Sequence, residues 1–265
     1  MASDGPSLNM DLLSYSVNAG IARVVLNRPE KRNALNPELI AALGEALAIS
    51  ARDAKASVVL ILGAGKDFCA GLDLVGLDVA GEADAMGHLE AAQHLADVLL
   101  AIRRHPRPVV AAVHGRALGG GAGIATACDL ILAAESAAIG YPEVKIGFVP
   151  AIVGALLRRS VTEKRVFGLL AGGEPLPAPE AKAIGLINQV FSDAEFEARV
   201  EAYVQNLASK SASALSLTKR LLYHTDGMTL EKAIEAGVLM NAVSRSTEDA
   251  KRGFARFRAG SKKKS

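Results

Sequence analysis

The sequence predicts an α/β fold in which helices cover a largely parallel sheet. Three observations support this prediction. Short apolar runs rich in β-branched residues alternate with segments whose apolar residues recur at helical spacing, a pattern typical of parallel sheets. Half of the 265 residues are apolar, which is ample for a large core. From Asp193 onward the pattern is almost wholly helical.

The N-terminal part of the chain predicts two strands joined by a helix. Asn36 and Pro37 are a typical N-cap and first helical residue. Leucines at helical spacing continue that helix to about Arg52. The predicted elements are, in order, a turn at residues 18–20, a strand over 21–26, a polar loop over 27–32, a helix over 37–52 and a strand over 57–62.

The rest of the chain continues the alternation. Residues 75–87 have no apolar period, which predicts either a variable surface loop or a wall over a site. The predicted elements that follow are a helix over 88–104, a strand over 108–113, a short glycine-started helix, a strand over 129–134, helices over 151–159 and 163–171, and a strand over 186–191.

The change to helical texture near residue 195 has no Pro/Gly/Ser-rich linker before it. We therefore expect residues 1–194 to form the α/β core, and residues 195–265 to form a helical C-terminal region of the same fold.

Charge and cysteine content limit the function. The chain has 30 Lys+Arg and 28 Asp+Glu, so no global field favours a nucleic-acid or membrane partner. Lys262–Lys264 favour a frayed solubilising tail over a binding patch. Cys69 and Cys128 are too few for a secreted disulfide framework. With no apolar run of signal-peptide or membrane-span length, we expect a cytoplasmic protein.

Several common chemistries are excluded by spacing. A dinucleotide fingerprint beginning at Gly119 would need a third glycine at Ile124. A P-loop ending at Lys66 would need a glycine at Leu60. The sequence has no G-x-S-x-G elbow, its cysteines lie in apolar runs, and its histidines lack metal-site spacing. We therefore expect no metal and no nicotinamide or flavin dinucleotide.

Two small-residue turns and one carboxylate remain as candidate chemistry. Ala70–Leu72 and Gly119–Gly121 each follow a predicted strand and can present backbone N–H groups, because glycine has no Cβ to cover them. Two converging amides can stabilise a developing oxyanion, and Glu143, on a proline turn, can move a proton beside them. The alternatives are a turn shaped for close packing and a solvated turn glutamate.

Four segments in register resemble the enoyl-CoA hydratase/isomerase (crotonase) family. They are RPEKRNALN over residues 28–36, FCAGLDL over 68–74, GRALGGGAGIATACD over 115–129 and YPEVKIG over 141–147. The resemblance spans about residues 10 to 260. It implies a crotonase-like spiral of ββα units with a helical C-terminal trimerisation region, and an acyl-CoA thioester substrate. It also implies a homotrimer or a dimer of trimers, with no cofactor because CoA is part of the substrate.

The resemblance also implies residue roles. The N–H groups of Leu72 and Gly120 would form the oxyanion hole, and Glu143 would shuttle the proton. Phe257 and the lysine tail would reach CoA from the C-terminal helix. The residues implied to line the CoA site are Lys31, Arg32, Ala34, Leu35, Ala70, Gly71, Leu72, Asp73 and Leu74.

The chain departs from the family pattern at one position. Family hydratases carry two glutamates, but Gly123 stands where the first would be. Family Δ3,Δ2-enoyl-CoA isomerases use the second alone, so the single glutamate favours isomerisation. The alternatives are a 2-enoyl-CoA hydratase, a catalytically weak acyl-CoA-binding protein, and a thioester hydrolase or decarboxylase in which Gly123 leaves room for a bulkier acyl group.

Overall fold

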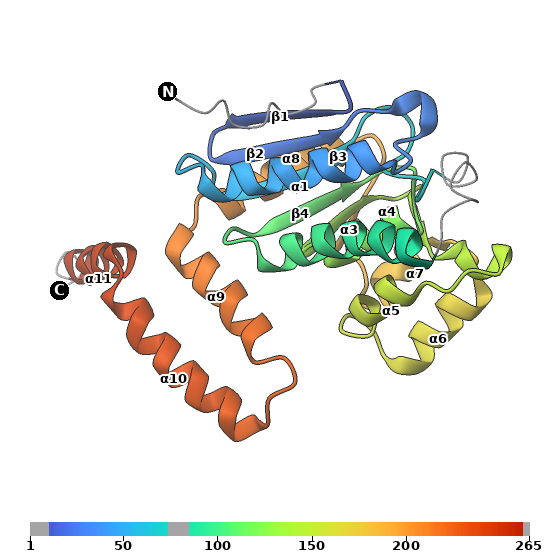
Figure 1. Ribbon diagram of the computed structural model, residues 1–265. Coiled ribbons are helices and arrows are strands. Elements are labelled where there is room, and N and C mark those ends of the chain that lie inside the picture. The colour runs from blue at the N-terminus through green and yellow to red at the C-terminus, as the bar shows by residue number, and fades with distance from the viewer. Residues whose placement is uncertain (1–10, 74–84, 262–265) are drawn as a thin grey trace, which may run out of the picture.

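A mainly parallel sheet forms the centre of the molecule, as predicted (Figure 1). The computed structural model describes residues 11–73 and 85–261, and the element bounds refer to these residues. β1 pairs antiparallel with β2, and the other neighbours pair in parallel. In spatial order the strands are β1 (Leu13–Asn18), β2 (Ile21–Leu26), β3 (Val58–Gly63), β4 (Val109–Val113), β6 (Leu130–Ala134) and β9 (Gln189–Phe191).

A second, smaller sheet lies beside the first and was not predicted. It consists of β5 (Arg116–Leu118), β7 (Ala138–Gly140) and β8 (Leu176–Pro177), in that order. β5 and β7 are parallel, with Leu118 opposite Gly140. This pairing brings the segment after β7 next to the segment after β5, which are the two places where candidate chemistry lies.

Helices cover both faces of the main sheet (Figure 1). α1 (Pro37–Arg52) and α3 (Ala85–Arg104) pack together on one face, and the Asn36 side chain caps α1 by accepting a hydrogen bond from the Leu39 N–H. α8 (Phe196–Ala208) packs on the other face, where Arg23 of β2 pairs with Glu201. The shorter helices are η1 (Pro29–Lys31), α4 (Gly120–Ala127), η3 (Pro142–Ile146), α5 (Ala151–Leu157), α6 (Glu163–Gly172) and α7 (Ala178–Ala183).

Two predicted boundaries are wrong. α3 begins at Ala85, three residues before the predicted start, and most of the predicted loop lies outside the described residues. The last strand begins at Gln189 rather than Leu186. Both Leu186 and Ile187 donate their N–H groups to the Ala181 carbonyl, so their apolar side chains are buried as part of the turn after α7.

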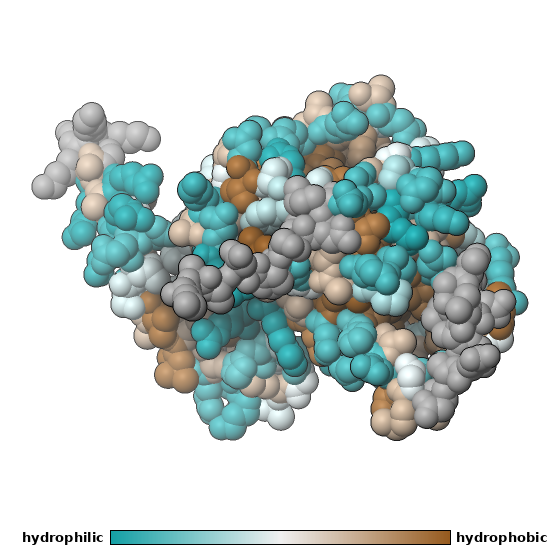
Figure 2. Space-filling view, turned by 45° about the horizontal axis from the view of Figure 1, so that its top comes forward, coloured by the Kyte–Doolittle hydropathy of each residue, from teal (hydrophilic) through white to brown (hydrophobic). Residues whose placement is uncertain are grey.

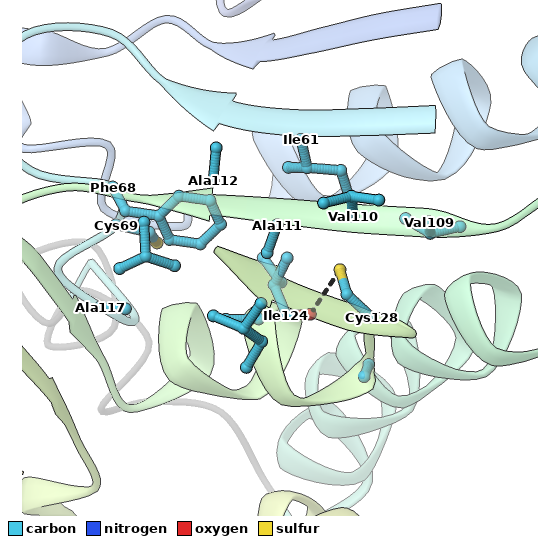
Figure 3. Close-up of a cluster of buried hydrophobic side chains, with 14 of the residues drawn as sticks. Ile61, Phe68, Cys69, Val109, Val110, Ala111, Ala112, Ala117, Ile124 and Cys128 are labelled. Carbon is cyan, nitrogen blue, oxygen red and sulfur yellow. Dashed lines mark hydrogen bonds between the residues drawn. The ribbon is translucent and has the colours of Figure 1, made fainter. Parts of the chain in front are cut away.

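α4 is embedded in the core against β4. Ile124 and Cys128 lie beside Val110 and Ala111 of that strand (Figure 3). Both cysteines are buried, as expected, and burial raises the pKa of the Cys69 thiol to about 12. Neither thiol is therefore suited to nucleophilic chemistry.

The C-terminal helices form an arm that projects from the core (Figure 1): α9 (Ala212–His224), α10 (Leu230–Ser246) and α11 (Glu248–Ser261). A buried ion pair fastens α9 to the core. The Lys219 ammonium lies 2.8 Å from an Asp129 carboxylate oxygen and donates to the Ile102 carbonyl at 2.9 Å. Tyr223 also donates to Asp129.

Beyond this attachment the arm exposes apolar side chains (Figure 2). On α10 these are Leu230, Ile234, Val238, Leu239 and Val243. None of the helices in the described residues is long and apolar enough to span a membrane.

Candidate active site

The first candidate turn, Ala70–Leu72, is held by backbone pairing with β5. The Cys69 N–H donates to the Arg116 carbonyl, and the Cys69 carbonyl accepts from the Leu118 N–H at 2.9 Å. Gly71 has a φ of +97°, and a Cβ placed on it would lie 2.9 Å from the Leu118 carbonyl oxygen. Glycine is therefore required here for both its φ and its close approach.

The Leu72 N–H is left available by the pairing around it. Leu35 forms an isolated parallel bridge with Leu72. In this bridge the Leu35 N–H donates to the Gly71 carbonyl, and the Asp73 N–H donates to the Leu35 carbonyl. Among the described residues, the Leu72 N–H has no hydrogen-bond acceptor. A ligand could therefore accept a hydrogen bond from the Leu72 N–H.

The second candidate turn begins α4 directly beside the first. Gly119 is the N-cap, with a φ of +51°, and its N–H donates to the Gly140 carbonyl at 2.9 Å. Gly120 is the first helical residue, so its N–H has no intrahelical acceptor. A Cβ placed on Gly120 would lie 3.8 Å from the Leu72 Cγ. The two turns therefore adjoin, and both N–H groups are part of one candidate site.

The alternative explanation, close packing, accounts for a different glycine. A Cβ placed on Gly121 would lie 2.5 Å from the Cys69 carbonyl oxygen and 2.6 Å from its Sγ. Gly121 thus permits contact between α4 and the first turn. Gly119 instead faces the Glu143 carboxyl, and Gly120 faces the side chains of Leu35 and Leu72. Close packing therefore explains Gly121, and the N–H groups that follow Gly119 remain a candidate binding site.

Glu143 lies in η3, beside the N-cap of α4. A Cβ placed on Gly119 would lie 3.1 Å from the Glu143 Oε1. The Oε2 atom is buried and has no hydrogen-bond partner, and within the described chain Glu143 forms no ion pair. Burial raises the pKa of this carboxyl above that of an ordinary glutamate. These features disfavour a solvated turn residue and fit a group poised for proton transfer.

The loop predicted to line the CoA site is fixed by residues that sequence analysis missed. Asn33 is fully buried with a φ of +56°, and its side chain donates to the Ala64 and Asp67 carbonyls at 2.8 Å each. Its Oδ1 accepts from the Arg28 N–H. Asparagine adopts this left-handed conformation more readily than most residues. The sequence signal was present, but the two carbonyls to which Asn33 donates are more than 30 residues away.

The predicted CoA-site residues form two neighbouring groups. Lys31 and Arg32 are exposed at the tip of the first loop, Ala34 is half-buried and Leu35 is buried. Arg28 joins this loop to the second group through an ion pair with Asp73 at 3.1 Å. Ala70, Gly71, Leu72 and Asp73 form the second group. Leu74 and Lys262–Lys264 lie outside the described residues, and Phe257 is exposed on α11.

An ion pair between Arg116 and the buried carboxylate of Asp67 holds the start of β5. The Arg116 side chain donates to both carboxylate oxygens of Asp67 at 3.1 Å, and Asp67 is 1% exposed. Burial alone would raise the pKa of Asp67, but the hydrogen bonds from Arg116 hold it below its usual value. The pair fixes the start of β5. The Ala70–Leu72 turn follows the residue that pairs with this strand, and the Gly119–Gly121 turn directly follows the strand itself.

The chain matches the family model described as Enoyl-CoA hydratase/isomerase over residues 16–264. This chain belongs to that family. A Thermus thermophilus protein provisionally named as an enoyl-CoA hydratase is 40% identical over 89% of this chain and 94% of its own. The (E)-benzylidenesuccinyl-CoA hydratase of Thauera aromatica is 33% identical over 92% of this chain and 95% of its own.

Solved structures support the same family assignment. An enoyl-CoA hydratase from Mycobacterium smegmatis superposes with a TM-score of 0.90 at 32% identity, covering 94% of this chain and 96% of its own. The crotonase fold expected from the resemblance is therefore confirmed. The protein is an enoyl-CoA hydratase/isomerase family enzyme that acts on acyl-CoA.

At Gly123, where this chain departs from the family hydratases, the space beside the glycine is filled rather than empty. A Cβ placed on Gly123 would lie 2.9 Å from the Val153 Cγ2 and 3.6 Å from the Leu99 Cδ1. The expectation that Gly123 leaves room for a bulkier acyl group is therefore wrong, because Val153 of α5 fills that room. A second carboxylate could enter here only if Val153 moved.

A surface cavity of about 710 Å³ lies elsewhere, between α6 and α7. Its lining includes Lys164, Leu169 and Ile184 and none of the residues around Glu143. The two adjoining N–H groups without acceptors and the unpartnered Oε2 of Glu143, rather than cavity size, mark the candidate active site.

Proposed function

We propose that this enzyme isomerises 3-enoyl-CoA thioesters to 2-enoyl-CoA thioesters. The observation that carries the proposal is a single unpartnered, half-buried carboxyl, Glu143, placed beside two available N–H groups. No second acid lies at Gly123, where Val153 fills the space.

In the proposed mechanism, the N–H groups of Leu72 and Gly120 hold the thioester oxygen. Ionised Glu143 removes a proton from C2, and negative charge spreads to the oxygen and to C4. The two N–H groups stabilise this dienolate. The neutral Glu143 then returns the proton to C4, which leaves the double bond between C2 and C3. The raised pKa of Glu143 suits both steps, because the carboxyl must accept the proton and then release it.

We propose the same placement of CoA that the family resemblance implies. Leu35 and the Ala70–Asp73 segment lie against the amide pair. Lys31 and Arg32 are exposed cations beside them, since the Arg32 carbonyl accepts a hydrogen bond from the Ala70 N–H. Cations near this edge would suit the phosphates of CoA. We also propose that Leu74 and Lys262–Lys264 contact CoA.

We also propose a homotrimer or a dimer of trimers. The support is the row of exposed apolar side chains on α10, where Leu230 is 71% and Leu239 is 70% exposed. Apolar patches of this kind on a helix usually mark a contact with another chain.

Hydration of 2-enoyl-CoA is the second candidate. It is favoured by the names of the relatives from Thermus thermophilus and Thauera aromatica, which are both hydratases. In this chain Glu143 alone would have to orient the water and move its proton, since Gly123 offers no acceptor.

The deciding experiment supplies 3-enoyl-CoA and 2-enoyl-CoA in parallel and identifies the products. The proposal expects faster conversion of the first than hydration of the second. Glu143→Gln should lower turnover by about 10²- to 10⁴-fold while keeping thioester binding. Glu163→Gln, at an exposed glutamate on α6, is the matched control and should change nothing. Undiminished turnover by a folded Glu143→Gln enzyme would remove the mechanism.

A further inference from the structure

A buried hydrogen bond joins the segment that carries Glu143 to the helix that carries Gly120. The Tyr141 hydroxyl lies 2.7 Å from the Thr126 Oγ1, and Tyr141 is 1% exposed. The Thr126 hydroxyl donates its one proton to the Ala122 carbonyl at 2.7 Å. Tyr141 must therefore be the donor to Thr126, because a hydroxyl has a single proton to give.

This bond is the second of two connections between the same pair of segments. The first is the hydrogen bond from the Gly119 N–H to the Gly140 carbonyl, at the start of α4. Thr126 lies seven residues further along the helix, which is about 10 Å. The pairing of β7 with β5 and the packing of η3 against α6 also hold the Glu143 segment. The two hydrogen bonds to α4, about two turns apart, fix its orientation relative to that helix.

Glu143 follows Tyr141 by two residues, so its carboxyl is placed by this double attachment. Its Oε2 has no hydrogen-bond partner within the described chain, so no protein group fixes the side chain through that oxygen. Proton transfer needs the base within hydrogen-bond reach of the reacting carbon, and a misplacement of about 1 Å can cost about a hundredfold in rate. The carboxyl is thus free to react and yet depends on distant groups for its position.

We propose that Tyr141 and Thr126 are a positioning pair that holds Glu143 in register with the Leu72 and Gly120 amides. The proposal rests on the proposed role of Glu143 as the base. It assigns a role in the rate of the chemical step to two buried residues that do not touch the substrate. Burial raises the pKa of the Tyr141 hydroxyl, so the donor stays protonated over the working range of the enzyme.

The test uses Tyr141→Phe, Thr126→Val and Thr126→Ser in the full-length enzyme. Phenylalanine keeps the ring and valine keeps the branched shape, but each removes the hydrogen bond. Both should lower kcat by about tenfold with CoA-thioester affinity unchanged by calorimetry. The double variant should be no slower than the slower single variant, because the two residues act as one unit. Thr126→Ser keeps the hydroxyl and should restore kcat to within about twofold.

A merely structural role predicts a different result. In that case the melting temperature would fall, but kcat, measured well below it, would not change. Wild-type kcat in folded Tyr141→Phe would overturn the proposal, as would equal kcat for Thr126→Ser and Thr126→Val. Tyr141→Phe keeps the test decisive if Thr126→Val, which leaves a buried hydroxyl without its acceptor, does not fold.

Glu143→Gln is measured in parallel to separate the two proposals. If it retains full turnover, the proposed function fails, whatever Tyr141 does. If it is inactive while Tyr141→Phe and Thr126→Val retain wild-type kcat, only the positioning pair fails.

Discussion

Restoring a second carboxylate at Gly123 should shift the enzyme toward hydration, provided that Val153 is reduced at the same time. Gly123→Ala alone shows the steric cost. Alanine in place of a helical glycine gains about 1 kcal/mol in helix stability. Its Cβ would lie 2.9 Å from the Val153 Cγ2, and such overpacking costs about 1–3 kcal/mol. The single substitution is therefore expected to be neutral or destabilising, and Gly123→Glu more so.

The double variant Gly123→Glu with Val153→Ala removes the atom that blocks the position. A hydrogen bond from water to a carboxylate contributes about 1.5–3 kcal/mol when one partner is charged. If it is formed in the hydration transition state, the ratio of hydration to isomerisation should rise about ten- to a hundredfold, since about 1.4 kcal/mol is a factor of ten. Val153→Ala alone is the control, because it opens the same space without adding an acceptor.

The assay follows loss of 2-enoyl-CoA absorbance and, separately, formation of 2-enoyl-CoA from 3-enoyl-CoA. Circular dichroism and calorimetry with a non-reactive CoA thioester establish that the double variant folds and binds. A folded, binding double variant whose hydration ratio equals that of Val153→Ala would refute the reasoning. It would mean that the missing acceptor does not limit hydration in this enzyme.

Four further predictions concern pH, stability and assembly. Activity should decline on the acid side with an apparent pKa above that of an ordinary glutamate, because burial raises the pKa of Glu143 and only its ionised form is the base; a pH–rate profile with an unshifted acid limb would contradict this. Burial lowers the pKa of His105 to about 4, so the folded state resists its protonation and stability is lost as the pH falls from about 6.5 to 4. Denaturant titration should show about 3 kcal/mol more loss over this range in the wild type than in His105→Gln, and equal losses would exclude His105 as the cause. Lys219→Met should destabilise by about 3–5 kcal/mol by leaving the largely buried Asp129 carboxylate without its cation, whereas the exposed control Lys232→Met should stay within about 0.5 kcal/mol; equal melting temperatures would count against the anchor. Light scattering should show a trimer or hexamer at micromolar concentration, and a monomer would refute the proposed assembly.

The elements with strong local signals could be predicted from the sequence. α1 begins after Asn36 and ends at Arg52, as predicted, because its cap and its apolar spacing are both local properties. The strands β3, β4 and β6 were found because strands covered on both faces are continuous apolar runs. β2 was found from a similar run, which only Arg23 interrupts. In these segments the local preference and the tertiary environment agree, so one predicts the other.

The polar residues that fix the site could not be predicted in the same way. Asn33 reaches Ala64 and Asp67, and Arg116 reaches Asp67 across 49 positions in the chain. Nothing near Asn33 in sequence indicates these partners. The family resemblance supplied the position of the loop, but only the structure shows that buried hydrogen bonds hold it there.

The geometry of the candidate active site depends on the elements with the weakest local signal. β5 and β7 have three residues each, too few for an apolar period, and yet their pairing brings the Glu143 segment to α4. The local sequence signal of this arrangement is the glycines in the two turns. Gly71 and Gly119 have positive φ, and side chains there would meet the Leu118 carbonyl and the Glu143 carboxyl. Each of the two therefore marks a place where distant backbone or the candidate base comes close. A glycine that follows a predicted strand in this way is a local signal of a long-range contact, and here the contacts of both glycines lie in the candidate active site.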